Sequence, residues 1–600
     1  MPLSSRWLAV GPTIALTTLS AHNVTALTTP VLASHPVTAM PGAQTTAPTL
    51  FAQASDLPPN LPSVPSSTLD DTLPDRPSDP TDLAPASDNV SPPTINLPTP
   101  SETPESTPVP ETSFFIETIN VVGSTVLTEE IAEQVARYEQ KNVTFSDLLT
   151  LRSDLTQLYI QNGYITSGVF LPSNQVLTDG TVTLQVVEGA VEDITVIGLR
   201  HLRDSYVRDR LSLSTTTPLN QQALEERLQL LQLDPFITRI NAELTAGSTP
   251  GRNRLQVDID EPSPWLASIG TNNYRSPSIG STEVSTTVGR NNLVGIGDRL
   301  SATYGLTEGL NIWDVDVSVP VNPREGTVSF GFNSSNSEII TDEFEELEIE
   351  SETRSYSLNF RQPLMRSPNE EFALGVGLDL RRRQTFILGD EPFSFSEGAE
   401  DGETNATVLR FSQDWLKRSP NRVLAARSQF SIGLDAFNAT VNDTGTDARF
   451  FSWIGQFQWV QQLSQRNLII GRISTQLTPD SLLSLEQFSI GGVDTVRGYS
   501  QNELVADNGV LASVEMRIPL TKNPQRFQLT PFIDAGTVWN NRTPDPEETT
   551  LVGVGLGLRW LIRPDFVAEL DYGIPLISVD DDSDSLQADG LYFSLRYQPF

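Results

Sequence analysis

The stretch Val552-Gly553-Val554-Gly555-Leu556-Gly557-Leu558-Arg559-Trp560 alternates strictly between apolar residues and glycine or arginine. A period of two is typical of a β-strand whose two faces meet different surroundings. Residues 372–381 and 566–573 show the same alternation. In all three segments one face is apolar and often aromatic, and the other is small or charged. This pattern predicts strands that separate an apolar medium from a polar one.

About 16 such segments lie between Trp265 and Phe600, each close to the roughly 9 to 11 residues that cross a bilayer at a tilt. The strands of a soluble β-sandwich also alternate between apolar and polar residues. Over so many strands, however, the charged face would be too large for the exterior of a sandwich. A barrel with lipid outside and water in its lumen resolves this, and its strands must close because hydrocarbon tolerates no sheet edge. We therefore expect an all-β transmembrane barrel over residues 263–600.

The composition excludes several classes of site. Cysteine is absent, so there is no disulfide and no thiolate metal site. The net charge of −36 disfavours nucleic-acid binding, which needs a basic face. The histidines are His22, His35 and His201, so the predicted barrel holds no histidine triad or histidine-ligated metal. No Walker-type loop is present. We expect no enzyme activity, cofactor or metal, although carboxylate pairs of the glycosidase kind occur in lumens generally.

The N-terminal region resembles an export leader followed by a spacer. Arg6, the mostly apolar residues 7–19 and Val24-Thr25-Ala26 predict a signal peptide over residues 1–26. Residues 27–112 are dominated by Pro, Thr, Ser and Asp and predict an extended, disordered linker. A signal peptide and a barrel together indicate the outer membrane of a Gram-negative or similar bacterium.

Two copies of one α/β module separate the linker from the barrel. The first has a strand pattern over residues 115–121, helical patterns over 131–138 and from Ser146 as N-cap to Gly163, and strand patterns over 164–171 and 181–187. Its opening Ile119-Asn120-Val121-Val122-Gly123 returns as Ile194-Thr195-Val196-Ile197-Gly198, followed by the same element order. Such a recurrence marks tandem copies. We expect β-α-α-β-β modules over residues 113–189 and 190–262.

Several motifs resemble those of one protein family. The tract from Gly163-Tyr164 to Phe170-Leu171-Pro172, with Asp179-Gly180 and Val187-Glu188-Gly189, resembles the first polypeptide-transport-associated (POTRA) domain of two-partner secretion transporters, the TpsB or haemolysin secretion/activation family. Val496-Arg497-Gly498-Tyr499 resembles the loop motif of the wider superfamily, which includes barrel assembly factors, and Phe532-Ile533-Asp534-Ala535-Gly536 resembles its strand motif. The resemblance covers residues 114–600, and the order of the motifs makes it specific.

The predicted barrel places the two barrel motifs side by side. With the modules in the periplasm, the loop over residues 478–508 is the sixth outer loop, where the family carries its motif. Along residues 527–535 the apolar set faces lipid, so Asp534 faces the lumen. Arg497, on a loop folded into the lumen, would reach Asp534 through two charge-assisted hydrogen bonds. An exposed Arg-Gly turn is the alternative, and the sequence leaves open whether the pair is shielded from water.

Four further residues are candidates around this pair. Gly498 would supply a conformation or a close approach that a Cβ blocks, and Tyr499 would pack against the wall. Glu515 and Arg517 lie on the polar face of residues 510–518 and are candidate lumen contacts. Generic pore lining is the alternative for both.

The resemblance implies protein export rather than catalysis. A POTRA-like sheet would bind an unfolded client by adding it as a strand, and Tyr164, Phe170, Leu171 and Pro172 are the candidate client-binding residues. The implied partners are a secreted exoprotein and outer-membrane lipid. An outer-membrane protein insertion factor of the same superfamily is the alternative. A passive porin is a third hypothesis, which does not explain the tandem modules.

Overall fold

The computed structural model describes residues 95–96, 112–173, 175, 180–342, 344–443, 445–464, 466–579 and 585–599. They form two compact units, one with the α/β modules and one with the barrel. The predicted signal peptide, nearly all of the predicted linker and Asp179 lie outside the described residues. Within the described part, no helix combines the length and the hydropathy that a membrane-crossing helix needs.

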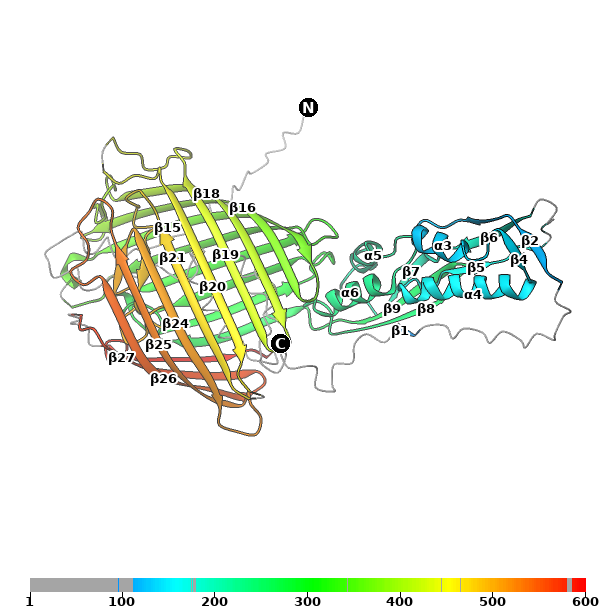
Figure 1. Cartoon of the computed structure of the whole chain (residues 1–600). Helices are drawn as coiled ribbons and strands as arrows, with labels where there is room; N and C mark the ends of the chain where they lie inside the picture. The colour runs from blue at the N-terminus through cyan, green and yellow to red at the C-terminus, as the bar shows by residue number, and fades with distance from the viewer. Residues whose placement is uncertain are drawn as a thin grey trace, which may run out of the picture. The chain divides into compact units, whose positions relative to one another are not determined.

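The described barrel is one closed antiparallel sheet of 16 long strands, with the two-residue β17 (Glu391–Pro392) as an addition to β16 (Figure 1). The long strands are β10 (Trp265–Asn272), β11 (Glu283–Asn291), β12 (Arg299–Leu306), β13 (Leu310–Pro320), β14 (Thr327–Glu338), β15 (Glu350–Arg366), β16 (Glu370–Ile387), β18 (Glu403–Ser419), β19 (Arg422–Gly433), β20 (Phe451–Gln462), β21 (Leu468–Leu477), β24 (Asn508–Pro519), β25 (Phe527–Trp539), β26 (Thr550–Arg563), β27 (Phe566–Pro575) and β28 (Leu591–Tyr597). Pairing of β10 with β28 closes the sheet. The predicted barrel class and strand number are confirmed.

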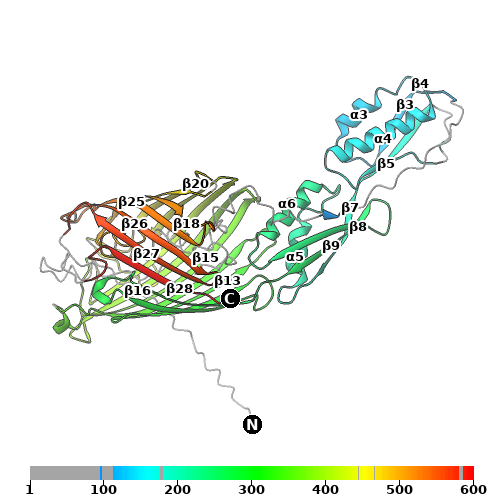
Figure 2. The same cartoon turned by 90° about the horizontal axis from the view of Figure 1, so that it is seen from below.

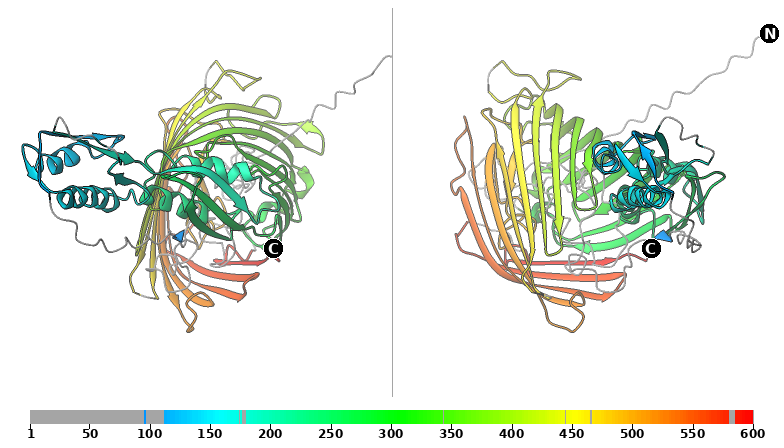
Figure 3. Two further views of the ribbon diagram at one scale, coloured as in Figure 1. Left: turned by 90° about the vertical axis from the view of Figure 1, so that its right-hand side faces the viewer. Right: turned by 45° about the vertical axis from the view of Figure 1, so that its right-hand side comes forward.

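The barrel wall is apolar outside and polar inside. On β16, Val376 is 50% exposed, whereas Asp379 and Arg383 on the alternate face are 5% and 1% exposed. On β25, Ile533 is 50% exposed and its neighbour Asp534 only 1%. Buried charge beside exposed aliphatic side chains inverts the soluble pattern and suits a wall that faces hydrocarbon. Figure 3 shows the tilted strands from two further directions.

The first module consists of two helices and two small sheets. Its elements are β2 (Phe114–Ile116), β3 (Thr118–Val122), α3 (Thr128–Val135), β4 (Lys141–Val143), α4 (Phe145–Gln161), β5 (Gly168–Phe170) and β6 (Thr181–Val187). The strand predicted over residues 115–121 is split at Glu117, because β2 pairs with β4 whereas β3 pairs with β6. The strand predicted from Tyr164 begins only at Gly168, since Ser167 N–H donates to the Tyr164 carbonyl in a turn. Figure 2 shows α4 beside β5.

Helix α4 begins two residues earlier than its sequence suggests. The predicted N-cap Ser146 is wrong, because Thr144 is the cap. The Asp147 N–H donates to Thr144 Oγ1 at 3.1 Å, and the Thr144 N–H donates to Asp147 Oδ2 at 2.7 Å. These two bonds form a capping box. The pKa of the Asp147 carboxyl lies below its ordinary value, because its Oδ2 accepts hydrogen bonds from both the N–H and the hydroxyl of Thr144, which favour the ionised form.

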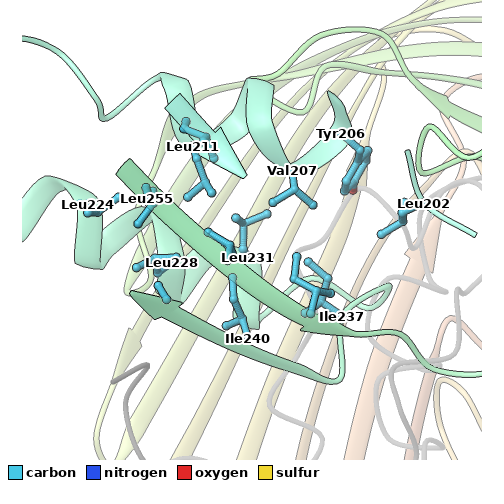
Figure 4. Close-up of a cluster of buried hydrophobic side chains, with 14 of the residues drawn as sticks. Leu202, Tyr206, Val207, Leu211, Leu224, Leu228, Leu231, Ile237, Ile240 and Leu255 are labelled. Atoms are coloured by element: carbon cyan, nitrogen blue, oxygen red, sulfur yellow. The ribbon is translucent and has the colours of Figure 1, made fainter. Parts of the chain in front are cut away.

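The second module repeats the first with a larger sheet. Its elements are β7 (Ala190–Ile197), α5 (Asp204–Ser212), α6 (Gln221–Gln232), β8 (Arg239–Ala246) and β9 (Arg252–Asp260). Leu211 of α5 and Leu228 of α6 pack with Ile240 and Leu255 of the sheet into one apolar core (Figure 4). Helical and strand periodicities therefore converge on one buried layer, as the sequence predicts.

The repeated glycines occupy the same position in both modules. Gly123 ends β3 with φ of 89° and Gly198 ends β7 with φ of 90°. A Cβ at Gly123 would strike the Val186 carbonyl, and one at Gly198 the Ile259 carbonyl. Each glycine thus combines a left-handed backbone with a close approach that only glycine tolerates.

The two modules differ at their sheet edges. Within the stretch predicted as a linker, β1 (Ile95–Asn96) pairs in parallel with Ala242 and Glu243 of β8. This sheet has the order β1-β8-β9-β7, so β1 covers the β8 edge at these two residues. In the first module the order is β3-β6-β5, and β5 is an edge strand among the described residues.

Candidate functional site

A long loop packs inside the barrel wall. It joins β21 to β24 over residues 478–507, which makes it the connection between the eleventh and twelfth long strands. It contains the short pair β22 (Phe488–Ile490) and β23 (Leu504–Ala506). Apolar residues of the loop, among them Val496 and Tyr499, form a buried cluster with Leu511 of β24 and Val538 of β25. The loop is therefore anchored to the inner face of the strands that follow it.

Arg497 pairs with Asp534 through both carboxylate oxygens. Its Nε donates to Oδ2 at 2.8 Å, and its Nη2 donates to Oδ1 at 3.1 Å. The backbone N–H of Arg497 also donates to Oδ2, at 3.2 Å. Arg497 is 5% exposed and Asp534 is 1% exposed, so the pair is largely shielded from solvent. The geometry is the bidentate arrangement that fixes orientation as well as position.

Other strands complete the surroundings of this guanidinium. Nη1 donates to Glu515 Oε2 of β24 at 3.0 Å and lies 3.6 Å from Asp571 Oδ1 of β27. The guanidinium carbon stacks 3.4 Å from the ring centre of Phe532. Arg517 Nε donates to Glu515 Oε1 at 3.2 Å. Both predicted lumen contacts thus lie in the cluster, Glu515 directly and Arg517 through Glu515.

The two residues after Arg497 are held by backbone contacts. Gly498 has φ of 105°, and its N–H donates to the Tyr592 hydroxyl at 2.9 Å. A Cβ there would come within 3.0 Å of the Pro575 nitrogen. The Tyr499 hydroxyl lies 2.9 Å from the carbonyls of both Val552 and Ile577. The loop backbone is therefore pressed against β26 to β28, which explains the Gly-Tyr sequence.

Three residues of this site, Gly553, Gly573 and Tyr592, are not identified by the sequence alone. Gly553 and Gly573 face the loop, and a Cβ on either would strike the backbone of Arg497 or Gly498. Gly536 of the strand motif also makes room for the loop, because its Cβ would lie 3.3 Å from Val496. Tyr592 binds the loop twice, since its hydroxyl also donates to the Tyr499 carbonyl at 2.6 Å. Alternation places Gly553 and Gly573 on inward faces but does not reveal what they touch.

The four client-binding candidates do not form one surface. Phe170 at the end of β5 is 49% exposed, and Pro172 is exposed as well. Tyr164 and Leu171 instead pack against the core of the first module, and the Tyr164 ring meets Tyr159 edge-on at 6.0 Å between centroids. Two of the candidates are thus available to a partner, and two support the strand from behind.

The lumen next to Arg497 is charged but offers no metal site in the described residues. The cavity there is lined by side chains of both signs, including Arg472, Arg559, Glu569 and Asp571. Nowhere in the ranges that the structure covers do three His, Cys, Asp or Glu side chains gather as a metal ion requires. The cations of the cavity are arginines, which suit ion pairing rather than proton transfer.

Comparison with known proteins matches this architecture. Residues 251–560 match the model of the "Haemolysin secretion/activation protein ShlB/FhaC/HecB" family, and residues 114–189 match the "POTRA domain, ShlB-type" model. The outer membrane transporter CdiB of Dickeya dadantii is 22% identical over 480 residues, which are 75% of this chain and 81% of that protein. The hemolysin transporter protein HpmB of Proteus mirabilis is 24% identical over 470 residues, covering 74% and 78%.

Solved structures show the same fold. CdiB from Escherichia coli superposes with a TM-score of 0.64 at 20% identity, covering 84% of this chain and 92% of that one. BamA from Haemophilus ducreyi lacking POTRA domains 1–3 gives a TM-score of 0.51 at 15% identity, covering 81% and 100%. At these identities the likeness concerns the fold alone.

Proposed function

This chain belongs to the ShlB/FhaC/HecB family of haemolysin secretion/activation proteins of the outer membrane, and we propose that it exports an unfolded exoprotein through its barrel. The observation that carries the proposal is the loop held inside the barrel by the buried Arg497–Asp534 pair. A loop bound to the inner wall obstructs the lumen until it moves, as a regulated pore requires. The curated relatives are transporters by name, which supports transport rather than catalysis.

The edge of β5 is the proposed docking site for the client. A sheet edge binds an extended peptide through main-chain hydrogen bonds, and nearby side chains add selectivity. The β8 edge of the second module already pairs with β1, which supports strand addition as a property of these modules. On β5 the exposed Phe170 provides apolar area beside the edge. Tyr164 and Leu171 would hold the strand in place from the core side.

Photocrosslinking tests this docking site. A photoreactive phenylalanine analogue at position 170 is expected to capture one large exoprotein during export, because the client would lie along β5. Phe145 is the matched control, since it is 57% exposed but lies at the start of α4, away from the edge. Mass spectrometry of the adducts gives the readout. Equal capture at both positions would contradict the edge.

The same adducts separate export from barrel assembly. The likeness to BamA favours an insertion factor as the alternative, because that structure shares the fold. Capture of many barrel precursors would support this alternative, whereas capture of a single exoprotein supports secretion. A passive porin would capture neither, and it has no use for tandem modules.

We propose that transport consumes no nucleotide and is driven by folding of the client outside the cell. No Walker-type loop occurs in the sequence, which supports this energy source. A client variant that cannot fold outside is expected to stall in the pore. Pulse-chase labelling with protease added outside the cells measures its emergence. An unchanged rate of emergence would rule this energy source out.

A further inference from the structure

A second buried ion cluster holds the first half of the same loop. Glu486 lies in the loop, nine residues after β21 ends at Leu477 and eleven residues before Arg497. Its Oε1 accepts from Arg381 Nη1 at 2.8 Å, and its Oε2 accepts from Arg410 Nη2 at 2.9 Å. Glu486, Arg381 and Arg410 are 7%, 3% and 4% exposed. The carboxylate is therefore paired with two guanidiniums away from water.

Neighbouring residues reinforce this contact. Arg381 Nη1 also donates to the Leu485 carbonyl at 2.9 Å, and Arg383 Nη2 donates to Ser484 Oγ at 2.9 Å. Leucines of the loop pack with side chains of β18 and of the segment before β20 in one buried cluster: Leu482, Leu483, Leu485, Ala406, Val408, Ala448 and Phe450. Residues 484–486 are thus fixed to the inner face of β16 and β18.

The two ion clusters lie on separate parts of the wall. Arg381 is on β16 and Arg410 on β18, whereas the partners of Arg497 are on β24, β25 and β27. The strands β19, β20 and β21 lie between these two groups in the sheet. Because the loop leaves β21 and returns at β24, it extends along the inner wall in both directions from its stem. It is anchored at two places rather than one.

We propose that Glu486 is a positioning residue that keeps the loop across the pore, and that the Glu486 anchor opens while the Arg497 anchor stays closed. This inference rests on the proposed function, because it assigns a step of pore opening. On β16 and β18 the Glu486 anchor is held by side chains, namely the arginines and the apolar Ala406 and Val408, and side chains can follow a moving loop. The Arg497 anchor also includes the backbone of Gly498 and Tyr499 pressed against β26 to β28.

The charges of the second cluster make the Glu486 carboxylate the group that holds this end of the loop. Three guanidiniums, Arg381, Arg383 and Arg410, face two carboxylates, Asp379 and Glu486. Within the described part of the chain, Nε and Nη1 of Arg383 have no hydrogen-bond partner. Like charges in a buried site repel one another more strongly than they do in water. Without the Glu486 charge, three cations would face one carboxylate, and the ion pairs that hold the loop to the wall would be lost.

Single cysteines measure the two anchors separately, because the natural chain contains none. Ser484→Cys reports on the first half of the loop and Ser500→Cys on the second, and these serines are 8% and 4% exposed. Adding Glu486→Gln is expected to speed maleimide labelling at position 484 by about 100-fold, since breaking a buried ion pair populates the open form. Labelling at position 500 is expected to stay unchanged.

The controls keep the result interpretable. Arg382→Gln alters a charge on the exposed face of the same strand and is expected to change neither rate. Arg410→Gln breaks the same contact from the wall and is expected to act as Glu486→Gln does, so a folding failure of one variant does not decide the outcome. Arg497→Ala is expected to speed labelling at position 500, which shows that the assay detects the second anchor.

Each outcome decides the proposal. Faster labelling at position 484 alone, with larger ion currents across planar bilayers, supports a separate first anchor. Faster labelling at both positions would mean that the loop moves as one body, and no change at either would mean that Glu486 does not hold it. Either result overturns the proposal. Labelling and current need no client, so their failure is distinct from a failure of export.

Discussion

Arg497→Ala is expected to lower export by about 100-fold while the barrel stays inserted in the membrane. Removing the guanidinium leaves Asp534 and Glu515 buried together without their shared cation. Breaking a buried pair in this way costs about 3 to 5 kcal/mol, chiefly because the remaining charge has no compensation. The Gly498 and Tyr499 contacts would then have to hold the loop alone. Secreted exoprotein is measured in the medium, and heat-modifiable migration of the barrel reports insertion.

Two companion variants test the geometry of the pair. Arg497→Lys keeps the charge but cannot bind both oxygens of Asp534, so we expect it to recover only part of the export. Arg497→Ala combined with Asp534→Ala is expected to lose less than the sum of the single losses, because the second change removes the orphaned charge. Normal export by Arg497→Ala would refute the role of the loop, and additive losses would refute the pairing.

Gly553→Ala changes the barrel wall and no loop residue, and it is expected to displace the loop. Gly553 is on the inner face of β26, and a Cβ there would strike the carbonyl oxygen of Arg497. That obstacle is backbone and cannot swing aside as a flexible side chain does. Overpacking of this kind costs about 1 to 3 kcal/mol, which corresponds to a loss of export of about tenfold or more. Export and labelling of a cysteine at position 500 measure the displacement.

Gly471→Ala is the matched control for this substitution. Gly471 lies within β21, and a Cβ there would meet Trp459 at an ordinary contact distance of 3.4 Å. We expect export and labelling as in the natural chain. If Gly553→Ala behaved like Gly471→Ala, the close approach of loop and wall would be irrelevant to transport. If both variants failed, the glycines would matter for the strands rather than for the loop.

The sequence alone determines the class of the barrel and the placement of its inward faces. Alternation with a period of two is a local signal, because successive residues of a strand point to opposite faces. Ile533 and Asp534 therefore reveal the outer and inner faces without knowledge of the rest of the chain. The recurrence of Ile119–Gly123 at Ile194–Gly198 likewise predicts the two modules. Helix and strand ends are less certain, as the cap at Thr144 shows, because a cap depends on bonds among a few local atoms.

Only the tertiary structure decides what the loop touches. Gly498 meets a hydroxyl 94 residues away in the chain, and Arg410 meets a carboxylate 76 residues away. Such contacts depend on the register of many paired strands and on the path of a long loop, neither of which leaves a local periodicity. The burial of the Arg497–Asp534 pair also depends on five strands that surround it. The sequence therefore determines the wall and its polarity, whereas closure of the barrel around the loop decides how that loop is held.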